Sequence, residues 1–119
     1  MKRDWEVVRQ ILLRLEALGD ASSVLCAGEI PGFDEQNVTY HMAILKDAGM
    51  IEADVVYGGE GFGMATRMTW DGHELLDHMR DQGTWNHVKR LIREKGLDVS
   101  IEAIRLAGKL LIERAFKVN

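Results

Sequence analysis

Hydrophobic residues recur at helical spacing along most of the chain, and one stretch between residues 51 and 69 has strand-like composition instead. The clearest helical segment begins at Asp34, a favourable N-cap, and ends at Gly49, where a left-handed residue can close a helix. At about 100° per residue, one arc of this helix carries Val38, His41, Met42, Leu45 and Ala48. The pattern predicts an amphipathic helix that packs this arc against the protein body.

The opposite side of this helix holds the candidate contacts to a partner. Asn and Gln side chains can pair with adenine, and a Lys can bind a phosphate. The apolar pair Ala43 and Ile44 beside Tyr40 fits a groove on a protein equally well. The candidate binding residues of the helix are Gln36, Asn37, Thr39, Tyr40, Ile44 and Lys46. His41 lies at the edge of the core arc, and we expect a structural histidine bonded to backbone.

Two strand-like segments at about 51–57 and 62–69 follow the helix, and glycines between them indicate a hairpin turn. The turn from Gly58 to Gly61 is not a phosphate loop, because no Lys followed by Ser or Thr leads into a helix. Arg67 is the only base of the hairpin and its candidate contact to a partner. We therefore predict a small antiparallel sheet with a flexible, glycine-rich tip.

Four more helices are predicted from apolar periodicity. The first spans Asp4–Leu18, and a second spans Trp70–Arg80 after a Thr69 cap and buries Leu75, Leu76 and Met79. Gly72 in this second helix indicates close packing, since glycine lowers helix propensity. The other two occupy about 84–95, capped by Thr84, and about 100–117, beginning at Ser100.

The last helix is apolar over most of its circumference, so its apolar side chains need other protein surface to cover them on more than one side. A homodimer through Ile101–Phe116 would supply this cover, and so would packing across the first helix and sheet of the same chain. Both alternatives remain open at this point.

The segment Ala21–Gly32 has two interpretations. Ser23–Ala27 alternates weakly and fits a short strand beside the hairpin, whereas Cys26–Ile30 fits a remnant of the second helix of a helix-turn-helix. Cys26 has apolar neighbours and neither His nor Lys beside it, which predicts a buried, inert thiol.

Together, Tyr40–Ile51, the hairpin and Thr69–Leu76 resemble the recognition helix, wing and following helix of winged helix-turn-helix domains. More narrowly, the chain resembles an uncharacterised domain-of-unknown-function family often found in phages and prophages. That resemblance rests on the Met1–Asp4 start, the Tyr40–Gly49 helix, and Thr69–His73 continuing to Trp85. It implies an α+β, mostly α, winged-helix fold, with a core at 1–82 and a helical extension at 83–119 packed on that core as one structural domain.

Charge complicates the DNA-binding function that such a fold implies. The chain carries −4 overall, with −4 in residues 20–50, −5 in residues 51–83 and +4 in residues 84–119. Neutralisation of phosphates by Lys and Arg supplies most of the non-specific affinity for DNA. The acidic core therefore disfavours a free-standing DNA binder, and basic terminal helices could instead meet an acidic protein partner.

Composition excludes several classes of protein. Apolar residues make up 46% and charged residues 29% of 119 residues, which fits one folded domain rather than a disordered chain. No apolar run approaches the roughly 20 residues that span a bilayer, and a single cysteine fits a reducing compartment. We expect a cytoplasmic protein without a membrane segment.

Chemistry-bearing motifs are absent from the sequence. His73 and His78 are five residues apart, about 140° on a helix, whereas the helical zinc motif needs histidines four apart. No serine lies near a histidine in sequence. We predict no enzyme, no catalytic residues, no metal and no cofactor. Two functions remain: a DNA-binding transcription regulator of phage or prophage origin, or a protein-interaction module that keeps the winged-helix shape.

Overall fold

The computed structural model describes residues 1–56 and 61–117. These residues are mostly helical, with five α-helices, a short 3-10 helix and a three-stranded antiparallel sheet, which confirms the predicted α+β class. The chain divides into two units, Met1–His73 and Glu74–Asn119, and helix α3 (Trp70–Asp77) contains the boundary. None of the described helices is both long and apolar enough to cross a membrane.

Helix α1 (Trp5–Glu16) begins the first unit. The Asp4 carboxylate accepts a hydrogen bond from the Glu6 backbone N–H at 2.8 Å, so Asp4 caps the helix. Its apolar stripe is buried as predicted, with Val7, Val8, Ile11, Leu12 and Leu15 in the core. These residues pack against α2 and β3.

Helix α2 (Glu35–Asp47) is the predicted amphipathic helix. Asp34 is its N-cap by backbone geometry, although its side chain makes no capping hydrogen bond. Gly49 has a φ of 77°, and the Met50 N–H donates to the Leu45 carbonyl at 2.9 Å. This left-handed closure confirms Gly49 as the helix stop and leads directly into β2.

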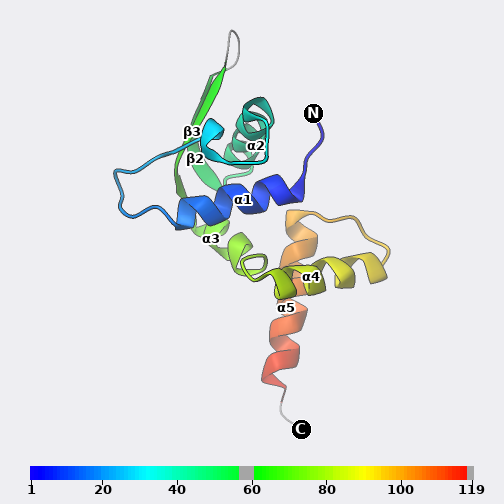
Figure 1. The fold of residues 1–119 in the computed structure, drawn as a ribbon. Coiled ribbons are helices and arrows are strands. Elements are labelled where there is room, and N and C mark those ends of the chain that lie inside the picture. The colour runs from blue at the N-terminus through cyan, green and yellow to red at the C-terminus, as the bar shows by residue number, and fades with distance from the viewer. Residues whose placement is uncertain (57–60, 118–119) are drawn as a thin grey trace. The chain divides into compact units, whose positions relative to one another are not determined.

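The sheet has the order β1-β3-β2, with β1 at Leu25–Cys26, β2 at Ile51–Val56 and β3 at Phe62–Met68. Figure 1 shows the β2–β3 hairpin beside α2. The predicted strand near residues 23–27 is confirmed as β1, which pairs with β3, and a 3-10 turn at Ala27–Glu29 follows it. Most of the predicted glycine turn, residues 58–60, lies outside the described residues.

A β-bulge at Thr66 reverses which way the last residues of β3 face. Glu52 pairs with Arg67, but Ala53 pairs with Ala65, so Thr66 is an extra residue opposite β2. Ala65 and Met68 are therefore both buried although they are three residues apart, while Arg67 is exposed. Strict alternation would have placed Arg67 on the same side as Ala65.

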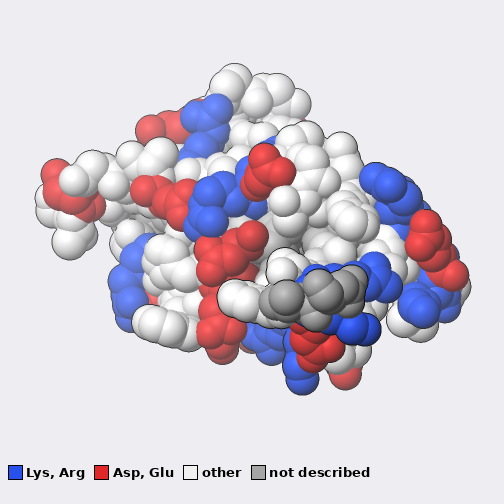
Figure 2. Space-filling model, turned by 90° about the horizontal axis from the view of Figure 1, so that it is seen from below, with Lys and Arg blue, Asp and Glu red and all other residues white. Residues whose placement is uncertain are grey.

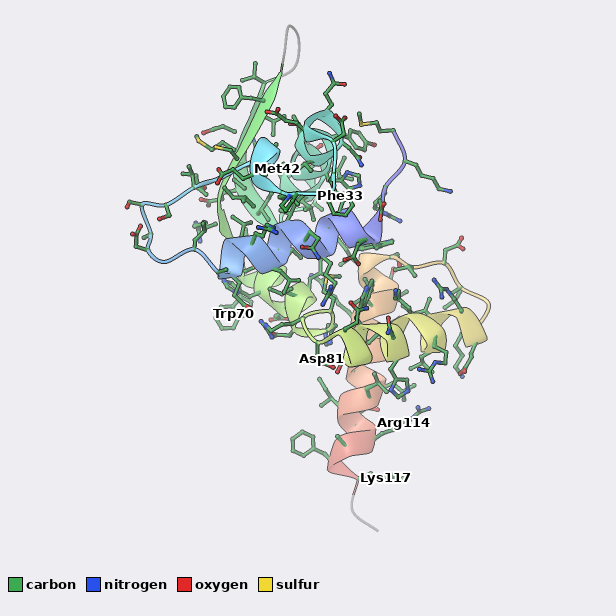
Figure 3. All side chains as sticks on the ribbon, in the orientation of Figure 1. Phe33, Met42, Trp70, Asp81, Arg114 and Lys117 are labelled. Atoms are coloured by element: carbon green, nitrogen blue, oxygen red, sulfur yellow. The ribbon has the colours of Figure 1, made fainter. Side chains whose placement is uncertain are left out.

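Gly63 lets β3 approach α2 closely. A Cβ atom at Gly63 would lie 3.0 Å from the Met42 sulfur and 3.3 Å from the Thr39 Cα. Met42, labelled in Figure 3, is fully buried. The absence of a side chain at Gly63 thus sets the distance between the hairpin and the helix.

Helix α3 is capped by Thr69, as predicted. Its hydroxyl oxygen accepts from the Gly72 N–H at 3.1 Å, and the hydroxyl donates to the Gly49 carbonyl at 2.6 Å. Gly72 has no room for a side chain because the Met50 carbonyl occupies the space, which confirms the expected close packing. The helix ends at Asp77 rather than Arg80, yet Leu75, Leu76 and Met79 are fully buried.

The second unit contains the predicted helical pair. Helix α4 spans Gln82–Glu94, and its N-cap is Asp81 rather than Thr84. The Asp81 carboxylate accepts from both the backbone N–H and the hydroxyl of Thr84, at 2.8 and 3.0 Å. Thr84 was a plausible cap by residue type, but the carboxylate three residues earlier takes that role. The buried residues of the helix are Trp85, Val88, Leu91 and Ile92.

Helix α5 spans Ile101–Phe116, and the Ser100 side chain caps it by accepting from the Ala103 N–H at 3.0 Å. Its N-terminal half packs on α4, with Ile104 fully buried. Its C-terminal half is uncovered: Ile112 is 51% and Phe116 is 81% exposed. Ala115 is exposed as well, so the side of α5 that faces inward ends near Leu111.

Candidate partner-binding face of helix α2

The exposed face of α2 brings four of the predicted binding residues together. Gln36 is exposed, and Asn37, Tyr40 and Ile44 are half-buried. Their spacing of one to four residues places them on one side of the helix, over about three turns. This face offers two side-chain amides, a phenol and an aliphatic surface to a partner.

Thr39, a fifth predicted contact on this helix, does not belong to the exposed face. Thr39 is 6% exposed because β3 passes close to it at Gly63, so Thr39 is removed from the candidate site. Ala43, expected to face outward, is also buried, and Ala48, expected in the core, is exposed. Helix α2 is in contact with α1, β2 and β3. Its buried arc is consequently wider than a simple amphipathic pattern predicts.

Lys46 is exposed, but it lies apart from the other candidate residues. It follows Tyr40 by six positions, which corresponds to about 120° around an α-helix. A ligand on the Tyr40 side would therefore meet Lys46 only by extending around the end of the helix.

His41 is a structural histidine, as expected. The ring is fully buried, and its Nδ1 lies 2.8 Å from the Asn37 carbonyl oxygen. Its Nε2 accepts a hydrogen bond from the Asp4 backbone N–H at 2.8 Å. Since Nε2 accepts, the proton resides on Nδ1, which then donates to the carbonyl. The Tyr40 ring meets it edge-on, with centroids 5.6 Å apart.

The chain before α1 runs alongside this face. Residues Met1–Asp4, which we name the N-terminal arm, line a cavity of about 500 Å³ together with Trp5 and Asn37. The Arg3 guanidinium stacks over the Trp5 ring at 4.7 Å from its centroid. The arm thus places the side chains of Lys2 and Arg3 beside one end of the α2 face.

Sequence reasoning missed the N-terminal arm as part of the site. The bases at positions 2 and 3 were visible, but they precede any periodic segment. Their position depends on the hydrogen bond from Asp4 to His41, which joins residues 37 positions apart. His41, at the edge of the core arc, was the available signal in the sequence. A buried imidazole needs a hydrogen-bond partner for each of its two nitrogens, and one of these partners could come from a distant segment.

Arg67, the predicted contact on the hairpin, is engaged by an acidic neighbour. Its Nε and Nη2 donate to the two carboxylate oxygens of Glu52 at 2.8 and 2.6 Å. This two-point hydrogen bonding lowers the pKa of Glu52 and raises the pKa of Arg67. An exposed ion pair of this kind leaves little net positive charge for a phosphate.

Cys26 is exposed, so its predicted burial is wrong. The strand β1 has only two residues, and Leu25 takes the inward position. The Glu29 carboxylate hydrogen-bonds the Cys26 thiol and raises its pKa, which lowers the fraction of reactive thiolate. In the described part of the chain, no group of three or more His, Cys, Asp or Glu side chains is arranged to hold a metal.

Comparison with known proteins gives a family but no activity. Residues 2–98 match a family of hypothetical proteins designated DUF2513. An uncharacterized protein of Haemophilus influenzae is 41% identical over 115 residues, which cover 96% of this chain and 98% of the relative. No solved structure gives a significant match.

Proposed function

The chain belongs to the DUF2513 family, and from this premise we propose that it is a winged-helix DNA-binding protein that regulates transcription. The observation that carries the proposal is the α2 face, where Gln36, Asn37 and Tyr40 project from one side of a helix braced by α1 and the hairpin. Side-chain amides on a helix can read adenine in the major groove. The succession of α2, hairpin and α3 supports the winged-helix assignment. We propose a binding protein rather than an enzyme.

Duplexes selected from a randomised DNA pool test this function. Fluorescence anisotropy should show an affinity that falls steeply as salt rises, because binding releases counterions. We expect Gln36→Ala and Asn37→Ala each to weaken binding to the selected duplex by about 1–3 kcal/mol, the usual contribution of a base contact. Gln82→Ala, on α4, is the matched control and should bind as the wild type does. Failure to enrich any duplex at low salt would exclude the function.

A second function is a protein-interaction module that keeps this shape. The observation in its favour is that Tyr40 and Ile44 form an apolar part of the α2 face, while Glu52 neutralises Arg67. Capture of partners from a lysate with the wild type and with Ile44→Asp distinguishes the two functions. Loss of a protein partner in the variant, without any DNA binding by the wild type, would favour this alternative.

Two further features belong to the proposal. An origin in a phage or prophage follows only from the resemblance of the sequence and stays a prediction. A homodimer through α5 is supported by the exposed apolar side chains Leu106, Ile112 and Phe116. A two-fold dimer, the commonest oligomer, would bury these side chains against the same helix of a second copy.

A further inference from the structure

We infer that the N-terminal arm binds a phosphodiester group of duplex DNA beside Asn37, with Lys2 and Arg3 supplying the positive charge. The inference rests on the proposed function and assigns a phosphate contact that the α2 face itself lacks. Specific DNA binders obtain register and orientation from backbone contacts, whereas contacts to base edges give sequence preference. A face with two amides and no base therefore needs a cation beside it.

The arm is fixed to α2 by a hydrogen bond rather than trailing from the domain. The Asp4 backbone N–H donates to the buried His41 ring, which also holds the Asn37 carbonyl one turn earlier in α2. The Asp4 side chain is engaged with the first turn of α1 through the Glu6 N–H. Both connections fix the backbone that carries Lys2 and Arg3 beside α2.

The open cavity beside the arm carries side chains that suit a phosphate group. Its volume of about 500 Å³ is lined by residues that include Lys2, Arg3 and Asn37. Arg3 is exposed, and a planar guanidinium suits two-point hydrogen bonding to phosphate oxygens. Stacking on Trp5 also reduces the side-chain entropy that Arg3 would lose on binding.

Local charge at the cavity differs from the charge of the surrounding segment. The acidic residues of α2 and its cap, Asp34, Glu35 and Asp47, do not line it. Asp4 is its only acidic member, and that carboxylate already accepts a hydrogen bond from the backbone of α1. The arm therefore supplies a positive site next to a helix whose own segment carries −4.

Salt-dependent DNA binding tests the site with a charge-matched control. The variant Lys2→Gln/Arg3→Gln should reduce the slope of log affinity against log salt by about 2, because each phosphate contact contributes about one unit. Arg90→Gln/Arg93→Gln removes the same charge from α4 and should leave the slope unchanged. A parallel titration of the full-length protein with inorganic phosphate, followed through the Asn37 side-chain amide signal by NMR, reports on the cavity directly.

The outcomes separate the two claims. A reduced slope in the arm variant alone, with a phosphate-induced shift of Asn37 that this variant abolishes, supports the inference. Wild-type DNA binding with the same slope in the arm variant overturns the inference and leaves the proposed function standing. A phosphate response at Asn37 without any DNA binding overturns both the proposed function and the assignment to DNA, and shows an anion site alone. Absence of both responses overturns both claims.

Discussion

At the residue scale, a single buried imidazole joins segments that lie far apart in the sequence. His41 satisfies the Asn37 carbonyl within α2 and the Asp4 N–H before α1. Both hydrogen bonds require the neutral ring with its proton on Nδ1. The ring itself is fully buried, so its two nitrogens have these backbone groups as partners in place of water.

The substitution His41→Phe should therefore lower the free energy of unfolding. It keeps an aromatic ring but takes the acceptor from the Asp4 N–H, at a cost of about 1–3 kcal/mol if that group stays unsatisfied. The Asn37 carbonyl loses only its second hydrogen bond, because it still accepts the helical bond from the backbone N–H of residue 41. Urea denaturation measures the change. Tyr40→Phe removes only a hydroxyl from the neighbouring half-buried ring and should be close to neutral. Equal stability of His41→Phe and wild type would refute this role of the histidine.

The Glu52–Arg67 pair predicts a change in proton binding. Arg67 lowers the pKa of Glu52 below its ordinary value. The pair therefore stabilises the fold fully above the ordinary carboxyl pKa, and this stabilisation is lost as pH falls through the lower pKa of the folded state. Arg67→Met should return the pKa of Glu52 toward its ordinary value, as followed by NMR titration. An unshifted Glu52 titration in that variant would show that the guanidinium is not the cause.

At the element scale, helical periodicity predicted the helices and most of their buried faces. Val38, Met42 and Leu45 are buried as the α2 pattern required. The same pattern could not identify Thr39, because its burial depends on a glycine in β3 that brings the strand against the helix. The register of the hairpin also escaped prediction, since one extra residue at Thr66 changes which side chains face inward. Local sequence encodes helix faces, whereas close approaches between elements depend on pairs of distant residues.

Packing of α5 within the second unit depends on such a pair. Gly108 is buried, and the His78 ring occupies the space that a Cβ atom there would need. Gly108→Ala should destabilise the unit by about 1–3 kcal/mol, the usual cost of overpacking. Calorimetric or urea unfolding measures the effect.

The sign of that effect should reverse when the histidine ring is removed. In a His78→Ala background, Gly108→Ala should stabilise the protein by roughly 1 kcal/mol, because alanine favours a helix over glycine and the obstacle is gone. A Gly108→Ala cost that persists unchanged in this background would assign the effect to some other contact.

At the scale of the whole molecule, the charge pattern and the exposed end of α5 have to be considered together. Figure 2 shows acidic and basic side chains intermingled around the end of α5. The basic side chains there include Arg114 and Lys117, both exposed and labelled in Figure 3. Apolar Ile112 and Phe116 lie four residues apart on one exposed side of the same helix. Such a mixed surface fits an interface between copies better than it fits a phosphate-binding field.

Sedimentation over a range of protein concentrations tests the proposed homodimer. We expect a concentration-dependent dimer for the wild type and a monomer for Phe116→Glu, because burying an unpaired carboxylate is costly. Arg114→Glu introduces an acid about 160° around the same helix from Phe116 and should leave the dimer largely intact. A wild type that stays monomeric at high concentration would remove the dimer from the proposal.

The extra residue at Thr66 has a consequence for reading the sequences of relatives. Deletion of Thr66 would join Ala65 directly to Arg67 and restore regular pairing with β2, with Arg67 still outward and Met68 still inward. A relative of the same length without the bulge would instead turn Arg67 toward the interior and Met68 toward solvent. Alignments of this hairpin should therefore accept a single gap at Thr66 without any change of polarity in the residues that follow it.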